Sequence, residues 1–239
     1  EEIIMVAANV RSQGEGGRKG RACVSLVPIF NHLTVEQMDE IMEVVHTHPY
    51  KKGQLIYRAE ETSDALYIVN RGRVKMYRLA ESGKEQLLRL LSPGDFTGEL
   101  ALFKQSVQEV YAEALVDSEI CQIRGDDLQD LLLRYPTISL KILTEFARRL
   151  EASEKQATSF ATEKVDTRIA VFLAECVTDD EVNEALIELP MTRKDLASYL
   201  GTTPETMSRK LTEFESLGLI SQKGARSIYL YDIDQLLLL

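Results

Sequence analysis

The sequence predicts an α+β protein with three successive parts: an antiparallel β-barrel or sandwich, a long helix, and a small domain of helices and strands. Short alternating strands separated by turn residues occupy the first half of the chain. Apolar residues then recur every three or four positions, which is typical of a helix. Two short helices and a strand hairpin follow. We expect a disordered tail, the barrel, the long helix and the last domain at residues 1–22, 23–135, 136–163 and 164–239, respectively.

The composition restricts the class of protein. The 239 residues suffice for two ordinary domains, and 44% hydrophobic with 28% charged residues is typical of a soluble globular chain. No apolar run of roughly 18 residues and no secretory leader occur, so we expect neither a membrane span nor export. The three scattered cysteines favour a reducing cytoplasm over a disulfide framework: Cys23, Cys121 and Cys176.

The N-terminal half divides into a tail, one helix and a run of strands. The glycine-rich basic segment SQGEGGRKGR lacks apolar periodicity and is expected to be disordered. Thr34, with Gln37 three residues on, predicts the start of an amphipathic helix that ends with His46 and His48 before Pro49. Beyond it, ALYIVN and VKMYRL alternate as half-buried strands do, and glycines punctuate the run up to VYAEALVDSEICQI.

The long helix carries a narrow apolar stripe. Its members step by three and four residues: Leu143, Phe146, Leu150, Ser153, Ala157 and Phe160. A helix packed on its own domain usually shows a wider stripe. The pattern therefore favours pairing with the same helix of a second subunit, the alternative being a helix packed on its own barrel.

The C-terminal domain has the layout of a winged helix-turn-helix. Thr192 and Gly201 are placed to begin and end one helix, and Thr203 with Pro204 to begin the next, which Gly218 stops. LISQKGARSIYLYD then predicts a hairpin turning at residues 223–225. On the second helix we expect Met207, Leu211, Phe214 and Leu217 to point inward.

The outer face of that second helix predicts contact with DNA, although the chain has a formal net charge of -10. Arg209 can bond guanine, Glu205 can accept from cytosine N4, and Ser208 suits several base edges. Positive or hydroxyl side chains around the helix are expected to reach phosphates: Arg193, Lys194, Thr202, Thr203, Lys210, Lys223 and Arg226. Acidic residues elsewhere would weaken non-specific binding.

Taken together, the order of parts and the segments GDFTGELALF and LGTTPETMSRKL resemble the CRP/FNR family of bacterial transcription regulators. The resemblance implies a β-roll of the cyclic-nucleotide-binding type, a homodimer, palindromic DNA and RNA polymerase as a partner. Glu205, Ser208 and Arg209 resemble the FNR branch, which implies inverted TTGAT-type half-sites. Pro204 stands where the cyclic-AMP branch has arginine.

The effector pocket implied by the resemblance departs from that of cyclic-nucleotide binders. Its matching residues are Gly98, Glu99, Leu100, Gln108 and Glu109. No arginine lies between Phe103 and Arg124, so nothing there would neutralise a cyclic phosphate, and we expect cyclic AMP not to bind.

The cysteines also differ from those of oxygen-sensing relatives. Cys121 matches the inner ligand of their four-cysteine cluster, but the N-terminal end offers only Cys23, so an iron–sulfur cluster is not expected. No cofactor is predicted. Cys23 and Cys121 could instead form a thiol–disulfide pair, because the family fold brings their segments together, or be two ordinary thiols. Cys176 is expected in the core.

Two other classes of function compete with DNA regulation. A metal-dependent, cupin-like barrel enzyme could use His46 and His48, yet no acid–base or nucleophilic group accompanies them and the third histidine, His32, lies apart. An interaction module that dimerises without binding DNA would not need Glu205, Ser208 and Arg209 together. The sequence leaves open the signal sensed and whether the protein activates or represses.

Overall fold

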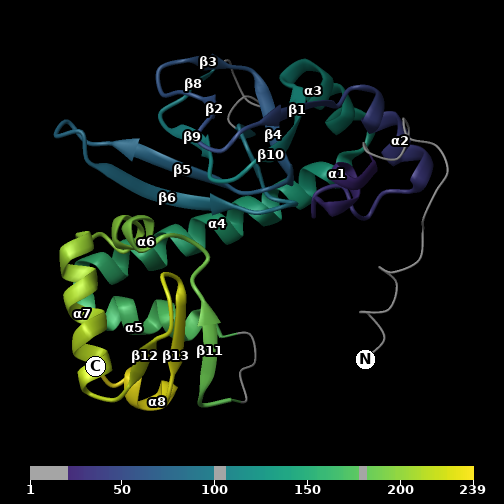
Figure 1. Cartoon of the computed structure of the whole chain (residues 1–239). Helices are drawn as coiled ribbons and strands as arrows, with labels where there is room; N and C mark the ends of the chain where they lie inside the picture. Colours follow the sequence, from purple (N-terminus) through teal and green to yellow (C-terminus); the bar gives the residue numbers. More distant parts are fainter. Residues whose placement is uncertain (1–20, 100–105, 178–181) are drawn as a thin grey trace. The chain divides into compact units, whose positions relative to one another are not determined.

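The computed structural model describes residues 21–99, 106–177 and 182–239, and Figure 1 shows how the helices and strands follow one another. The described residues form two compact units. The first holds those within 1–74, 91–108 and 113–142, and the second those within 75–90, 109–112 and 143–239. The expected disordered tail lies outside the described residues except for its last two, which begin helix α1 (Arg21–Leu26).

Short antiparallel strands make up the N-terminal β-roll, as the alternating pattern predicted. One sheet has the order β1–β10–β4–β7, formed by His46–Tyr50, Ser118–Arg124, Ala65–Arg71 and Phe96–Thr97. A second sheet has the order β2–β9–β5–β6, formed by Leu55–Tyr57, Tyr111–Ala114, Val74–Leu79 and Glu85–Leu91. The pair β3 (Thr62–Ser63) and β8 (Ser106–Val107) completes the strands of the roll.

The first predicted helix is confirmed in its start but ends earlier than expected. Helix α2 (Val35–Glu43) begins with a reciprocal cap: the Gln37 amide donates to Thr34 Oγ1 at 3.3 Å, and the Thr34 amide donates to Gln37 Oε1 at 2.9 Å. Helix α3 (Gly125–Arg134) follows β10 directly.

The prediction that His46 and His48 end this helix is wrong. Both lie in strand β1, where His46 pairs with Gln122 and His48 with Ile120 of β10. Strand β1 is at the edge of its sheet, and an edge strand tolerates Pro49, which cannot donate a ladder hydrogen bond. An edge strand needs little apolar burial, so the sequence of β1 is polar and lacks the alternation by which a strand is recognised.

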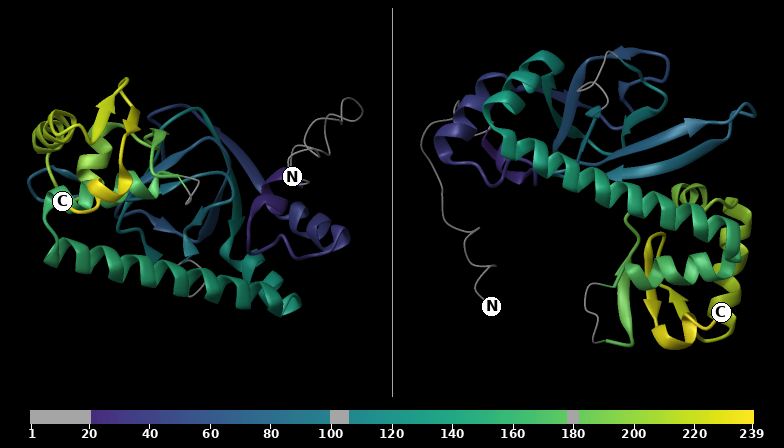
Figure 2. Two further views of the ribbon diagram at one scale, coloured as in Figure 1. Left: turned by 90° about the horizontal axis from the view of Figure 1, so that it is seen from below. Right: turned by 180° about the vertical axis from the view of Figure 1, so that it is seen from behind.

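The predicted long helix is α4 (Pro136–Thr162), a single uninterrupted helix in both views of Figure 2. Its first turns bury Ile138 and Ile142. From residue 143 on, two leucines of the apolar stripe are exposed, with Leu143 at 58% and Leu150 at 61% of their surface.

The C-terminal domain is a winged helix-turn-helix with its own core, as predicted. Its elements are α5 (Val165–Glu175), β11 (Ala185–Glu188), α6 (Arg193–Tyr199), α7 (Pro204–Ser216), β12 (Ile220–Gln222), β13 (Ser227–Leu230) and α8 (Ile233–Leu236). The strands form a sheet in the order β11–β13–β12, and Figure 1 shows the hairpin of β12 and β13. Residues 178–181, half of the expected acidic loop, lie outside the described residues.

The cap residues act as the sequence predicted. Thr192 Oγ1 accepts a hydrogen bond from the Asp195 amide at 3.1 Å, and Thr203 Oγ1 accepts one from the Thr206 amide at 3.2 Å. Gly201 and Gly218 have φ values of 66° and 72°, the left-handed conformation that ends a helix.

Candidate nucleic-acid interface

Helix α7 has one buried and one open face. Met207, Leu211 and Phe214 are buried in the winged-helix core. The expectation that Leu217 joins them is wrong, because it is the C-cap residue of the helix and 59% of its surface is exposed. The opposite face carries the three predicted base-reading residues, Glu205, Ser208 and Arg209, and all three are exposed. The geometry leaves these side chains free to reach a partner.

Glu205 stays ionised at the start of this helix. Its own backbone N–H and the Thr203 hydroxyl donate to the carboxylate and, with the positive charge of Lys84, lower its pKa below the usual range. A carboxylate in this state only accepts hydrogen bonds, as contact with a cytosine amino group requires. Within the described chain, no acceptor bonds the guanidinium of Arg209.

The residues expected at phosphates fall into two groups. Lys194, Lys223 and Thr203 are exposed, although the Thr203 hydroxyl also caps α7. Arg226 is exposed and pairs with Glu188 of β11 at 3.0 Å. Thr202 is 7% exposed, so it lies beneath this surface.

Arg193, a predicted phosphate contact, holds the wing, which is the turn at residues 223–226 between β12 and β13. Its Nε donates to the carbonyl of Ala225 at 3.0 Å, Nη1 to Gln222 Oε1 at 2.5 Å and Nη2 to the carbonyl of Gly224 at 2.9 Å. Glu215 of α7 accepts from the backbone and side-chain amides of the same Gln222 at 2.8 and 2.9 Å. These bonds set the turn at residues 223–226 against both helices, so Arg193 supports the wing, and its phosphate contact stays a prediction.

Lys210, another predicted phosphate contact, forms two ion pairs within the winged domain. Its ammonium lies 2.7 Å from Asp166 of α5 and 2.9 Å from Glu213 of α7, with 18% of its side chain exposed. The two carboxylates raise its pKa and take up its hydrogen bonds. A phosphate contact by Lys210 stays a prediction, although two of its three N–H donors are engaged within the domain.

In the roll, the predicted effector residues do not share one environment. Gly98 has a φ of 84°, and a Cβ there would lie 2.3 Å from the Ala65 carbonyl oxygen, so only glycine fits. Gln108 is buried, and its Nε2 has no hydrogen-bond partner among the described residues. Glu99 is half-buried, and Leu100 lies outside the described residues. Glu109, in contrast, is exposed and pairs with Arg78 of β5.

A buried polar cluster beside Gly98 was not predicted. Tyr57 Oη and Thr97 Oγ1 are 2.8 Å apart, and the Ser63 and Tyr67 hydroxyls are 3.1 Å apart. The two tyrosine rings lie 5.3 Å apart. These residues are spread over 40 positions of sequence, and no local pattern joins them; the only signal is their polarity inside otherwise apolar strands.

The cysteines are consistent with ordinary thiols where they are described. Cys121 is fully buried on β10, with its Sγ 3.4 Å from Thr47 Oγ1, and Cys176 is free and half-buried. Burial, with the negative charge of Glu175, raises the pKa of Cys176 to about 11. The side chain of Cys23 lies outside the described residues, so its pairing with Cys121 stays a prediction.

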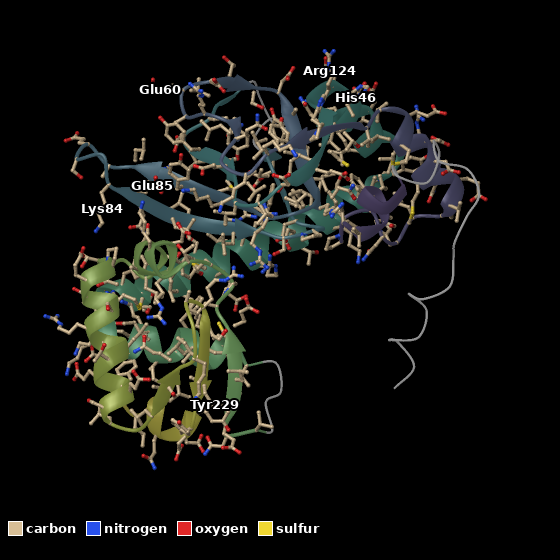
Figure 3. All side chains as sticks on the ribbon, in the orientation of Figure 1. His46, Glu60, Lys84, Glu85, Arg124 and Tyr229 are labelled. Atoms are coloured by element: carbon tan, nitrogen blue, oxygen red, sulfur yellow. The ribbon has the colours of Figure 1, made fainter. Side chains whose placement is uncertain are left out.

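The histidines expected of a metal enzyme lie exposed on β1 (Figure 3 labels His46). Within the described ranges, no three histidine, cysteine, aspartate or glutamate side chains are grouped to hold a metal ion. The helices of the same ranges include none that is long and apolar enough to cross a membrane.

Comparison with known proteins agrees with this architecture. Residues 47–135 match the cyclic nucleotide-binding domain, and residues 167–239 match the Crp-like helix-turn-helix domain. The chain is 37% identical over 203 residues to the probable transcriptional regulator Flp of Lacticaseibacillus casei, which covers 85% of this chain and 91% of that protein. The chain belongs to the CRP/FNR family.

Other CRP/FNR proteins support the same assignment. The anaerobic regulatory protein of Haemophilus influenzae is 30% identical over 210 residues, covering 87% of this chain and 80% of that protein. The solved structure of FixK2 from Bradyrhizobium japonicum superimposes with a TM-score of 0.68 at 27% identity, covering 81% of this chain and 96% of that one. As a CRP/FNR protein, the chain is a DNA-binding transcription regulator and not an enzyme.

Proposed function

We propose that this CRP/FNR regulator acts as a homodimer that reads inverted TTGAT-type half-sites through Glu205, Ser208 and Arg209. The observation that carries the proposal is the open face of α7, on which all three side chains are exposed. Arginine can bond guanine O6 and N7 together, and ionised glutamate can accept from cytosine N4. An interaction module without DNA binding would give these residues no such task.

Lys194 and Lys223 are the best candidates for phosphate contacts. Both are exposed, and neither lies in an ion pair within the described ranges. Arg226 and Thr203 can add contacts from the wing and from the start of α7. Phosphate contacts fix the register of a protein on the duplex and carry no sequence information.

Dimerisation through α4 is supported by its exposed apolar face. Leu143, Leu150 and Ala157 recur at steps of seven residues, which keeps them on one side of a helix with about 3.6 residues per turn. Phe160, in contrast, packs within its own chain, next to Gly201 and under the Arg168 guanidinium, whose Cζ lies 5.1 Å from the ring centroid. We therefore propose a seam of Leu143, Leu150 and Ala157 and leave Phe160 out of it. Phe146 lies between this seam and the side of α4 that carries Phe160.

The roll serves as the sensor, and its signal differs from a cyclic nucleotide. Glu109 is negative where cyclic-nucleotide binders have a phosphate-gripping arginine, and its partner Arg78 is already paired. Relatives include regulators named for anaerobic control, which favours a signal linked to oxygen or redox state. A Cys23–Cys121 switch is one such signal. RNA polymerase in the cytoplasm is the partner expected of the family.

Fluorescence anisotropy at roughly physiological salt tests this function, because non-specific binding is weak there. A duplex with two inverted TTGAT half-sites is compared with a scrambled duplex of equal length, each with reduced and with oxidised protein. We expect preference for the palindrome. Preference in one redox state alone supports the thiol switch, and equal preference in both states excludes it. No preference in either state contradicts the half-site assignment.

Half-site spacing provides the control for dimer binding. Two recognition helices of one dimer meet successive major grooves, which are about 34 Å apart. Inserting half a helical turn, about five base pairs, between the half-sites turns one of them to the other side of the duplex. Binding should then fall toward that of a single half-site. An affinity that does not depend on spacing would contradict the dimer.

A further inference from the structure

The hairpin of β5 and β6 is attached to the DNA-binding helices of its own unit. Ser198 of α6 donates through Oγ to the carbonyl of Glu85 at 2.7 Å and accepts from the amide of Leu87 at 2.7 Å. Gln86 Nε2 donates to the Ser198 carbonyl at 2.6 Å. Strand β6 is at the edge of its sheet, so the serine hydroxyl satisfies two groups that a neighbouring strand would otherwise bond.

Apolar packing adds to these hydrogen bonds. Leu87 is only 2% exposed and belongs to the same buried cluster as Leu196 and Leu200. Leu90 packs against the edge of that cluster. The hairpin is therefore part of the winged-helix core and not a free loop.

The tip of the hairpin lies beside the start of the recognition helix. The tip is a closed turn in which the Ala80 amide donates to the Lys84 carbonyl at 2.9 Å and Gly83 has a φ of 76°. A hollow of about 240 Å³ is lined by Lys84 of the tip, by Lys194 of α6, and by Thr202 and Pro204 at the start of α7. Figure 3 shows Lys84 on the side of the hairpin that faces α6 and α7.

The charges around this hollow leave the two lysines available. The Glu85 carboxylate is held by Lys75 at 3.0 Å, and Asp195 accepts from the Thr192 hydroxyl at 2.6 Å. Across the described part of the chain, neither Lys84 nor Lys194 has a carboxylate within 4.0 Å. Lys84 is nevertheless close enough to Glu205 to stabilise its ionised form. Lys84 and Lys194 thus offer two ammonium groups beside the exposed face of α7. They are suited to bind the phosphates of a duplex that contacts this face.

We propose that the hairpin tip is part of the DNA-binding surface and that Lys84 contacts a backbone phosphate next to the one held by Lys194. This inference rests on the proposed function, because it assumes that α7 enters the major groove. The proposal adds a DNA contact from the β5–β6 hairpin of the roll to those from the winged helix-turn-helix. Ser198 acts as a positioning residue, since it holds the hairpin in the place from which Lys84 can reach.

The salt dependence of binding by the full-length protein tests the contact. Each lost phosphate contact makes the slope of log Kobs against log salt less steep by about 0.9, so Lys84→Gln should change it by about 0.9 per protomer. Affinity should fall by a similar factor on the palindromic and the scrambled duplex. Lys52→Gln, an exposed lysine of the roll, is the matched control for the lost charge and should leave the slope unchanged. A Lys84→Gln slope equal to that of wild type overturns the proposal.

Ser198→Ala tests whether attachment of the hairpin to α6 is what places the Lys84 charge at the DNA. It removes the hydroxyl that joins α6 to β6, so it should weaken DNA binding in the wild type and have little further effect in the Lys84→Gln background. Fully additive losses would contradict docking as the cause. Failure of this inference leaves the preference for the palindrome intact, whereas failure of the proposed function removes that preference. The two failures are therefore distinguishable.

Discussion

Lys210 of the recognition helix forms an ion pair with Asp166 of α5, with Nζ 2.7 Å from Oδ2. The pair joins the helix that faces DNA to the first helix of the winged domain. Lys210, which the sequence suggests as a DNA contact, therefore also holds the recognition helix in place. A comparison with Lys223, which has no ion pair among the described residues, can separate the two roles.

Lys210→Met is expected to lower the Tm without changing the salt dependence of DNA binding. Methionine keeps the apolar stem but leaves Asp166 without its cation. Lys223→Met, on the exposed wing, should show the reverse: an unchanged Tm and a slope less steep by about 0.9 per protomer. Thermal melts and salt titrations check both variants. A less steep slope for Lys210→Met would show that Lys210 also contacts phosphate.

Leu150→Glu is expected to break the proposed dimer. Leu150 is exposed on the proposed seam of α4, and a carboxylate there would face its own copy in the partner without a cation. Light scattering after size exclusion should give the mass of one 27.0 kDa chain. Leu133→Glu on α3, which is 81% exposed and off the seam, is the control and should stay dimeric. A dimeric Leu150→Glu would contradict the seam.

The ion pairs of Glu145 should make stability depend on acidic pH. Glu145 accepts from Arg148 and Arg149 on the same helix, at 2.6 and 2.7 Å, and its pKa falls from 4.5 to about 2. Because the pKa of Glu145 is lower in the folded than in the unfolded protein, its ion pairs stabilise the fold above pH 4.5. This stabilisation is lost as the pH falls toward 2.

Glu145→Gln is expected to cost about 0.5–1 kcal/mol of unfolding free energy near pH 7, after solvent screening of a partly exposed pair. The difference from wild type should shrink as pH falls below about 4.5. Urea titrations at several pH values measure it, with Glu154→Gln on the same helix as a control. A difference that is constant from pH 7 to pH 3 would contradict the ion-pair account.

Cys176 is expected to resist alkylation in the folded protein. With a pKa of about 11, only about one thiol in a thousand is ionised at pH 8, and the thiolate is the reactive form. Iodoacetamide followed by peptide mass mapping should find Cys176 unmodified in native protein and modified in urea. Rapid labelling of native Cys176 would show that its surroundings are more open than the structure describes.

The features that could be predicted from the sequence depend on residues that lie close together in the chain. The caps of Thr34, Thr192 and Thr203 depend on residues three positions away, so their patterns are visible in the chain. The face shared by Glu205, Ser208 and Arg209 follows from helical periodicity alone. The cap and hairpin patterns predicted the winged domain, and the family resemblance then narrowed the predicted barrel or sandwich to a β-roll.

The features that could not be predicted from the sequence depend on contacts between residues that lie far apart in the chain. Arg193 bonds residues about 30 positions away, and Lys210 bonds one 44 positions away, so their charges suggested DNA while their partners were hidden. Leu87 enters a core whose other members begin at residue 169. Strand β1 was missed because its polar edge position removes the alternation by which a strand is recognised.

The most direct test of base reading measures Arg209→Ala against every single base-pair change in one TTGAT half-site. Bidentate contact with guanine predicts a loss of about 1–3 kcal/mol on the palindrome and loss of discrimination at one base pair only. Lys194→Ala, which removes a proposed phosphate contact, should weaken all duplexes about equally. An Arg209→Ala variant that loses the same affinity on every duplex, scrambled DNA included, would contradict sequence reading by α7.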